Sequence, residues 1–477
     1  MPPVLLAPWA AAQPWSPVAV PWAACDAVEA ATRLRGRPGL AWIDSALTDA
    51  RLGRWSIVAS DPRWHLSARG ADVSLLADGG THRLPAGALA ALAGAVGAEP
   101  APHLDLSSDL ARLPFLGGAI GTVGFEVGRE VERLPATTRD DIGAPDMAFG
   151  WYEAALVWDG LEQRGWLVGH AEAVAALQAR LEASQGTRPG PFEAGALRAA
   201  TSRDAYLAAV ARARAYIEAG DIYQVNYAQR FSVDVRGDGF DLYRQLRQVS
   251  PAPFAAYLDC RGEGGGVEVL SSSPERLLLA DGDALETRPI KGTRPRGATP
   301  EADACRAAEL RASAKDMAEH LMIVDLERND LGRVAAPGTV HVPEFAALES
   351  YRQVHHLTST VTATRRAEVG LEALLRATFP GGSITGAPKV RSMEIIDELE
   401  PVTRGVYTGA IGYISAHGRI DLNVAIRTIT LAAGVAHFHV GGAIVHDSQP
   451  EAEYTETLDK ARGMARALGV RLPDETQ

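Results

Sequence analysis

The chain has 477 residues, of which 47% are hydrophobic, 22% are charged and 6% are aromatic. This balance is typical of a folded globular protein and excludes wholesale disorder. Lys and Arg total 47 against 59 Asp and Glu, so the net charge is -12. An acidic chain of this kind is a poor match for nucleic acid or an anionic membrane. Any anionic ligand must therefore be held by a local cluster of basic side chains.

The three cysteines, Cys25, Cys260 and Cys305, lie far apart and form no CxxC pair. This pattern fits neither a disulfide framework nor a zinc site, and it predicts a cytoplasmic protein. Residues 1–25 carry no charge, but six prolines interrupt them. The prolines argue against a signal sequence and against a membrane helix. We expect an extended arm that leads into a first strand.

Residues 1–190 alternate short strand patterns with turns, and they form the first predicted region. Strands are predicted at 40–44, 55–59, 119–124 and 154–167, and helices near 87–96 and 171–183. Residues 184–202 gather Gly, Pro, Ser and Thr and are the best candidate linker.

The second predicted region covers residues 202–470 and begins with a helix at 203–218. Strands are predicted at 225–235, 255–258, 267–271, 407–414, 422–431 and 436–440. Helices and strands do not alternate in regular βαβ units, which argues against a doubly wound sheet. We expect an α+β fold with large, mostly antiparallel sheets packed as a sandwich, covering helices, and interleaved amino- and carboxy-terminal regions.

Two predicted helices carry carboxylates at matching spacing. Asp316 and Glu319 are three residues apart, as are Glu453 and Glu456, with Lys460 one turn further on. Residues at i and i+3 share one helix face. Two such faces together would offer an oxygen-rich site that suits Mg²⁺. The spacing alone leaves a solvated acidic surface equally open.

Lysine is scarce in this chain. Only Lys291, Lys315, Lys389 and Lys460 occur, against 43 arginines. Codon bias explains a preference for Arg, but a lysine can lose its proton and react, whereas a guanidinium cannot. Lys291 lies in the proline-bounded segment TRPIKGTRPRG, where a lowered pKa would make it a nucleophile. An ordinary surface lysine is the alternative.

The glycine-rich segment FPGGSITGAPK at 379–389 opens onto a predicted helix. It does not fit the GxxxxGK[ST] phosphate loop. A loop of this kind either brings backbone N–H groups to an anion or is a plain tight turn. The run GEGGG at 262–266 predicts a hairpin.

Taken together, these segments resemble the chorismate-utilising enzymes. That family includes anthranilate synthase component I, aminodeoxychorismate synthase component I, isochorismate synthase and salicylate synthase. The resemblance covers essentially all of residues 202–468 and is looser in the first half. It rests on the segments DIYQVNYAQRF, SSSPERLL, PIKGTRPRG, AEHLMIVDLERNDLGR, FPGGSITGAPKVRSMEIIDELE, RGVYTGAIGYI, IDLNVAIRTI and DSQPEAEYTETLDKARG.

Three features select within the family. Anthranilate synthases carry Ala where this chain has Lys291, and PIKGT resembles the aminodeoxychorismate synthases. Enzymes that use water as nucleophile carry a lysine at the position of Gln224. No glutaminase nucleophile motif is present, so the resemblance implies a separate glutamine amidotransferase subunit that supplies ammonia. Ala443 and His446 depart from the residues common in relatives, and no physical reason is evident from the sequence.

The resemblance also implies roles for individual residues. Lys291, Glu275 and His356 are implied to be catalytic. Glu319 and Glu456 are implied to bind Mg²⁺, supported by Asp316 and Glu453, and the Mg²⁺ would hold the ring carboxylate of chorismate. The implied substrate-binding residues are Gly292, Thr293, Thr385, Tyr407, Arg427, Gly441, Gly442, Lys460 and Gln224.

The leading hypothesis is conversion of chorismate and ammonia to 4-amino-4-deoxychorismate, for 4-aminobenzoate and folate biosynthesis, through a covalent intermediate on Lys291. The alternative within the family is anthranilate synthase component I. A third hypothesis is a catalytically silent chorismate or tryptophan sensor.

Overall fold

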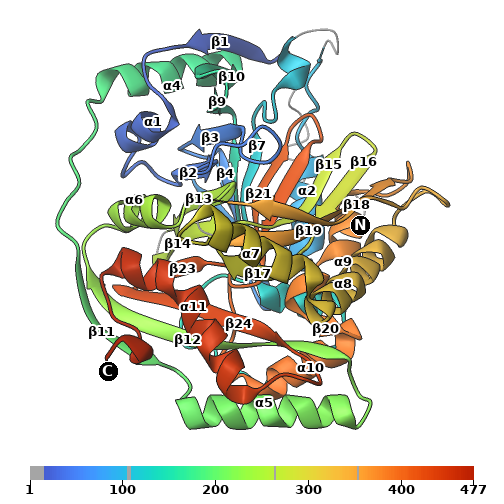
Figure 1. Cartoon of the computed structure of the whole chain (residues 1–477). Helices are drawn as coiled ribbons and strands as arrows, with labels where there is room; N and C mark the ends of the chain where they lie inside the picture. Colours follow the sequence, from blue (N-terminus) through green and yellow to red (C-terminus); the bar gives the residue numbers. More distant parts are fainter. Residues whose placement is uncertain (1–14, 105–108, 263–264, 352–353, 477) are drawn as a thin grey trace.

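The computed structural model describes residues 15–104, 109–262, 265–351 and 354–476, and all structural statements below concern these residues. Their strands form two twelve-stranded sheets in which paired strands run antiparallel (Figure 1). This confirms the predicted α+β class with large antiparallel sheets. No described helix is long and apolar enough to cross a membrane.

The first sheet mixes strands from both ends of the chain. β2 from the amino-terminal region pairs with β13 from the carboxy-terminal region, so one sheet crosses between the two. Its order is β1 (Val18–Trp22), β10 (Arg164–Gly169), β9 (Ala154–Asp159), β3 (Trp55–Ala59), β2 (Ala41–Asp44), β13 (Phe254–Gly262), β14 (Gly265–Ser273), β23 (Thr428–Ala432), β24 (Val435–Ile444), β12 (Gln224–Arg236) and β11 (Glu193–Ala199), and β20 (Gly386–Ala387) also pairs with β12.

The second sheet crosses between the regions in the same way, where β21 pairs with β7. The predicted interleaving is therefore confirmed in both sheets. The order is β17 (Ile290–Pro295), β19 (Val354–Thr364), β16 (Ala284–Arg288), β15 (Arg276–Asp281), β22 (Ile420–Val424), β21 (Ala410–Ser415), β7 (Gly118–Val123), β8 (Met147–Tyr152), β4 (Trp64–Arg69), β5 (Asp72–Ala77) and β6 (Gly80–Arg83), and β18 (His341–Ser350) also pairs with β19.

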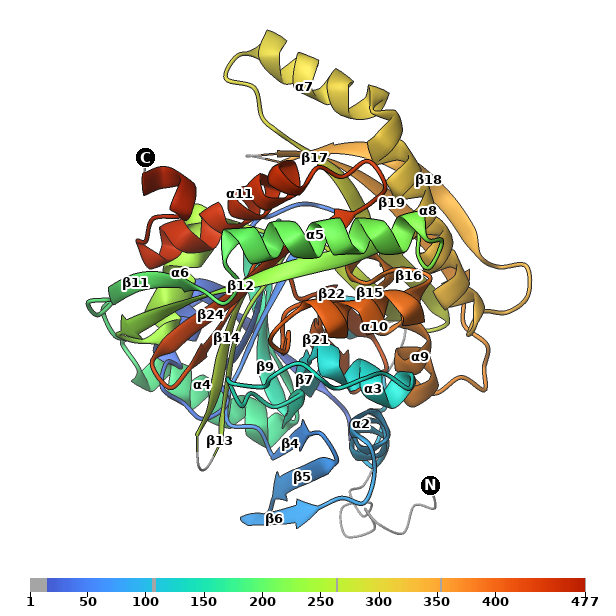
Figure 2. The same ribbon diagram turned by 90° about the horizontal axis from the view of Figure 1, so that it is seen from below.

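Helices cover the outer faces of the sandwich. α5, α10 and α11 contact β12 or β24 of the first sheet, and Figure 2 shows them gathered on that side. α8 contacts β17 and β19 of the second sheet. The helices are α1 (Ala27–Arg33), α2 (Ala88–Gly97), α3 (Gly128–Val131), α4 (Ala171–Ala183), α5 (Arg203–Glu218), α6 (Gly239–Val249), α7 (Pro300–Ala312), α8 (Ala314–Gly332), α9 (Leu371–Thr378), α10 (Lys389–Leu399) and α11 (Pro450–Leu468).

The apolar core has three parts, and the middle one lies between the sheets. It contains Ile57 and Val157 from the first sheet together with Ile120 and Ile411 from the second. The outer clusters lie under the helices: one joins the first sheet to α1, α4, α6 and α11, and the other joins the second sheet to α2, α9 and α10. Burial of these faces on both sides is the main stabilising contribution.

Several predicted boundaries are wrong in informative ways. The single strand expected at 154–167 is the β9–β10 hairpin, which turns where Gln163 has a φ of 51°. The strand expected at 422–431 is split into β22 and β23, which lie in different sheets. The predicted linker 184–202 contains β11, which pairs with β12. The first boundary is a local hairpin turn, whereas the other two are set by strand pairing that local composition does not encode.

Other expectations are confirmed. The predicted first strand is β1, while residues 1–14 of the arm lie outside the described residues. The run 262–266 lies at the β13–β14 connection, as a hairpin requires, although 263–264 also lie outside the described residues. The predicted helices at 171–183 and 203–218 match α4 and α5 at both ends.

Candidate functional site

Lys291 enters the site from β17. A register shift between Lys291 and Thr293 bends this strand at Gly292, which has a φ of 70°. A side chain at Gly292 would also lie 2.8 Å from Leu310, so glycine is required there. The Lys291 Nζ donates to the Ser383 carbonyl at 3.3 Å. Burial lowers the pKa of Lys291, although the nearby carboxylates of Glu319 and Glu275 oppose this shift.

Glu275 lies next to this lysine, in the turn between β14 and β15. Its side chain is buried, and Oε1 accepts the Ile290 N–H at 3.5 Å. Burial raises the pKa of Glu275 even though Lys291 and Arg427 favour its charged form. A carboxyl group whose pKa is raised, near an amine whose pKa is lowered, suits general acid catalysis.

Arg427 lies in the connection between β22 and β23, with a φ of 51°. Within the described part of the chain, no carboxylate forms an ion pair with its guanidinium. Burial lowers the pKa of Arg427, and the charge of Glu275 opposes this. A desolvated guanidinium without an ion-pair partner is a binding site for a carboxylate.

His356 lies on β19 opposite Thr293, and the Thr293 hydroxyl is 2.9 Å from its Nδ1. Burial and the charges of Arg427 and Lys460 lower the pKa of His356 to about 3, so the ring is neutral near pH 7. Its buried Nε2 has no hydrogen-bond partner among the described residues, and the same holds for both amide atoms of the fully buried Gln224. Such groups are available to a polar ligand.

The predicted metal ligands of α11 lie over the end of β24. A Cβ on Gly442 would be 3.4 Å from Glu453 Oε2, 3.6 Å from Glu456 Oε1 and 3.8 Å from Lys460 Nζ. Lys460 pairs with Glu456 at 2.7 Å and donates to the Gly441 carbonyl at 2.8 Å. Two carboxylates and a lysine thus surround one bare stretch of backbone.

The ligands predicted on α8 face the same region. Glu319 and Glu453 each lie within ion-pair distance of Lys315, at 3.8 Å and 3.9 Å. Asp316 instead pairs with Arg294 at 2.8 Å. Burial raises the pKa of Glu319 and of Glu453, so both sites would gain from a nearby cation.

This donor set fits Mg²⁺. All the predicted ligands are carboxylates, which this hard cation prefers. Three or more His, Cys, Asp or Glu side chains do not converge into a preformed metal cage in the described residues. Mg²⁺ usually binds through one or two carboxylates and completes its shell with water and substrate, so an open arrangement is consistent with it.

The glycine-rich loop at 379–389 is stabilised by hydrogen bonds and an ion pair of acidic and basic side chains. Glu327 accepts the Gly382 N–H at 2.9 Å, while Lys389 donates to the Pro380 carbonyl at 2.8 Å and pairs with Asp330. The Thr385 hydroxyl donates to the Gly381 carbonyl at 2.9 Å. The acceptor for the Gly382 N–H is therefore the internal carboxyl group of Glu327. The loop presents its Ser383 carbonyl to Lys291.

Tyr407 lies in the turn before β21 and packs between two other side chains of the site region. Its ring stacks on His439 with centroids 5.1 Å apart, and Arg404 lies over its face. Burial raises the pKa of Tyr407 to about 12, so its hydroxyl remains protonated. Together with Arg404 and His439 it lines a cavity of about 150 Å³.

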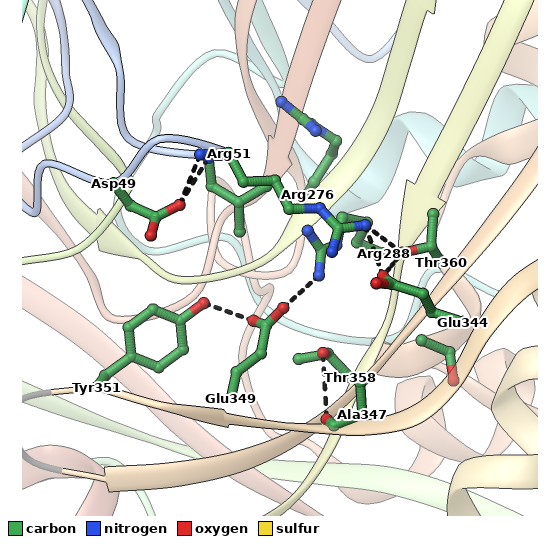
Figure 3. Close-up of polar contacts among 12 residues, drawn as sticks. Asp49, Arg51, Arg276, Arg288, Glu344, Ala347, Glu349, Tyr351, Thr358 and Thr360 are labelled. Carbon is green, nitrogen blue, oxygen red and sulfur yellow. Dashed lines mark hydrogen bonds and ion pairs between the residues drawn. The ribbon is translucent and has the colours of Figure 1, made fainter. Parts of the chain in front are cut away.

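A cluster of arginines and carboxylates supports β18 and β19, the latter of which carries the predicted histidine (Figure 3). The buried Arg288 of β16 pairs with Glu349 of β18. Arg51, from the loop before β3, pairs with Glu344 at 2.6 Å and donates to the Thr360 hydroxyl at 3.0 Å. The amino-terminal region thereby holds this edge of the site.

The structure brings most of the predicted residues together. The contacts and charge interactions described above link eleven of them: Lys291, Glu275, Thr293, His356, Arg427, Lys460, Gly441, Gly442, Glu319, Glu453 and Glu456. Sequence reasoning missed the roles of Lys315, Ser383, Glu327 and Lys389. The scarcity of lysine was the available signal, since all four lysines lie at the site or brace its loop.

Comparison with known proteins agrees with this geometry. The model of the chorismate binding enzyme family matches residues 45–466. Aminodeoxychorismate synthase component 1 of Klebsiella aerogenes is 43% identical over 457 residues, which cover 94% of this chain and 98% of that protein. The Escherichia coli K12 protein of the same name is 47% identical over 357 residues, 75% of this chain and 78% of that protein. The crystal structure of anthranilate synthase component I from Streptococcus pneumoniae TIGR4 superposes with a TM-score of 0.76 at 32% identity and covers 88% of this chain and 94% of that chain.

Proposed function

Because the chain belongs to the chorismate binding enzyme family, we propose that it converts chorismate and ammonia to 4-amino-4-deoxychorismate. The named relatives support this product, which leads to 4-aminobenzoate and folate. The observation that carries the proposal is the half-buried Lys291 close to the buried Glu275, an amine with a lowered pKa near an acid with a raised one. Residues 202–470 would form the catalytic region and residues 1–190 its support.

Two substitutions at the ring would complete the reaction. The neutral Lys291 amine adds to ring C2 while the 4-hydroxyl leaves, and Glu275 gives its proton to that leaving oxygen as water forms. Ammonia then attacks C4 and expels the lysine, and a proton from the incoming nitrogen returns to the site. Covalent catalysis divides one difficult displacement into two allylic ones. The neutral His356, held by Thr293, would bind a substrate oxygen without competing as an acid.

The carboxylates of chorismate would be bound by the basic groups of the site. Arg427 offers a guanidinium that has no ion-pair partner among the described residues, and Lys460 lies over the backbone of Gly441 and Gly442. Glu319 and Glu456 would hold Mg²⁺, with Glu453 and Asp316 in support, and the cation would neutralise the ring carboxylate. This local cluster provides the positive charge that an acidic chain otherwise lacks.

Ammonia would come from a separate glutamine amidotransferase subunit in the cytoplasm. The purified chain should therefore use ammonium salts but not glutamine. Glutamine-driven turnover by the isolated chain, free of contaminants, would contradict this part of the proposal.

The decisive experiment is product analysis. The purified chain is incubated with chorismate, Mg²⁺ and ammonium, and the products are separated by chromatography. Aminodeoxychorismate as the main product supports the proposal, fluorescent anthranilate would identify the alternative synthase, and binding without turnover would indicate a sensor.

Variants of Lys291 test the covalent step. Lys291→Arg keeps the charge but cannot act as a nucleophile, so we expect almost no activity. Lys291→Ala should lose most activity and regain part of it at high ammonium, and mass spectrometry of the wild-type protein should detect a ring adduct on Lys291. Wild-type rates for Lys291→Ala in limiting ammonia would leave the lysine only an electrostatic role.

A further inference from the structure

Lys315 lies between the two helices that carry the predicted metal ligands. Its Nζ is 3.8 Å from Glu319, one turn further along α8, and 3.9 Å from Glu453 on α11. Half of the Lys315 side chain is exposed, whereas Glu319 and Glu453 are only 15% and 5% exposed. The lysine therefore extends from solvent toward two less exposed carboxylates.

The ion pairs of the neighbouring carboxylates indicate the role of Lys315. The third carboxylate, Glu456, has its own partner in Lys460 at 2.7 Å. Lys315 is the cation that lies within ion-pair distance of both Glu319 on α8 and Glu453 on α11. Without it, neither carboxylate would keep an ion pair that joins the two helices among the described residues.

A divalent cation bound to Glu319 and Glu453 would use the same carboxylate oxygens that the Lys315 ammonium now contacts. Two positive charges that share these carboxylates repel each other. We infer that Lys315 is the counter-ion of the metal-free site: it ties α8 to α11 and withdraws into solvent when Mg²⁺ binds, so that it lowers the affinity for the metal. This inference rests on the proposed magnesium site.

The choice of lysine in a chain with 43 arginines has a physical reason on this basis. An ammonium on a flexible stem is compact and strongly hydrated, so it can return to water at small cost. A guanidinium at the same position would form parallel hydrogen bonds with the carboxylates and would leave less readily. Lysine and arginine at position 315 should therefore affect metal binding differently, although both carry one positive charge.

Calorimetric titration with MgCl₂ at constant ionic strength tests the inference without measuring turnover. We expect Lys315→Gln to bind Mg²⁺ roughly three- to tenfold more tightly than the wild type, the size expected for the loss of two partly exposed ion pairs. Lys315→Arg should bind Mg²⁺ more weakly than the wild type. Arg328→Gln removes the same charge from the same helix, about 20 Å away along its axis, and should change the affinity less than twofold.

Thermal unfolding adds a second measurement. Lys315→Gln should unfold at a lower temperature than the wild type when metal-free, and Mg²⁺ should raise its melting temperature by more. An unchanged or weaker Mg²⁺ affinity in Lys315→Gln would overturn the inference, as would equal affinities for the Gln and Arg variants.

Glu319→Gln identifies the site that is being titrated. If it leaves Mg²⁺ binding unchanged, the metal lies elsewhere, and both the metal assignment and this inference are wrong. The proposed reaction is tested separately, by the product that the wild-type chain forms.

Discussion

Two adjacent glycines at the end of β24 should respond to the same substitution in opposite ways. A Cβ at Gly441 would lie 2.6 Å from the Tyr227 carbonyl oxygen and 2.9 Å from the Ala228 Cβ on the paired strand β12. A Cβ at Gly442 would meet its nearest atoms at 3.4 Å or more, and these atoms belong to the charged side chains of α11. Gly441 therefore allows β24 and β12 to pair closely, whereas Gly442 leaves space next to the carboxylates of α11.

The magnitudes follow from these distances. Gly441→Ala must push β12 away from β24, and overpacking of this kind costs about 1–3 kcal/mol of stability. Gly442→Ala meets only van der Waals contacts, so its melting temperature should stay near that of the wild type. Its methyl group would, however, displace a ligand held over this backbone by about 1 Å, and a misplacement of that size lowers the rate roughly 100-fold.

The assay combines denaturant unfolding with kcat/KM for chorismate at saturating ammonium and Mg²⁺. We expect Gly442→Ala to lose roughly 10- to 100-fold in kcat/KM at unchanged stability. Wild-type kcat/KM in Gly442→Ala would refute the idea that substrate lies over this glycine. If Gly442→Ala lost as much stability as Gly441→Ala, the two glycines would not have the different roles assigned to them here.

Three further predictions concern the charges of the site. Because Lys291 must be neutral and Glu275 protonated, kcat/KM should rise with pH as the lysine loses its proton and fall as the carboxyl group loses its own. Burial lowers the pKa of Lys291 and raises that of Glu275, so both shifts increase the fraction of enzyme in the active state. In Glu275→Gln the alkaline fall should disappear while the rise remains, and persistence of the fall would reject Glu275 as the acid. Glu319→Gln and Glu456→Gln should each lose activity that added Mg²⁺ restores only in part, and an unchanged magnesium dependence in both would contradict the assignment. Lys389→Met leaves the buried Asp330 without its partner and should cost about 3–5 kcal/mol in urea unfolding, so a loss below about 1 kcal/mol would show that the loop does not depend on this pair.

Features that depend on neighbours along the chain were predictable from the amino-acid pattern. The boundaries of α4 and α5 agree with the prediction because apolar periodicity and caps act within a few residues, as at Ser202, whose side chain accepts the Ala205 N–H. The i and i+3 spacing placed Asp316 with Glu319, and Glu453 with Glu456, on shared helix faces. The rarity of lysine identified all four lysines as candidate functional positions.

Tertiary structure decided everything that depends on contacts between distant segments. Only the packing of α8 and α11 against the sheets brings Lys315 between Glu319 and Glu453. The apolar run at 422–431 has the same pattern whether it forms one strand or two. The structure divides it between the two sheets, and Arg427, with a φ of 51°, lies in the connection, where its charge acts on Glu275 and His356. Tyr407 matched a pocket segment, and its stacking on His439 of β24, with Arg404 over the ring, is a long-range arrangement that no local pattern predicts. Strand pairing and helix packing join residues far apart in the chain, and local periodicity carries no record of such partners.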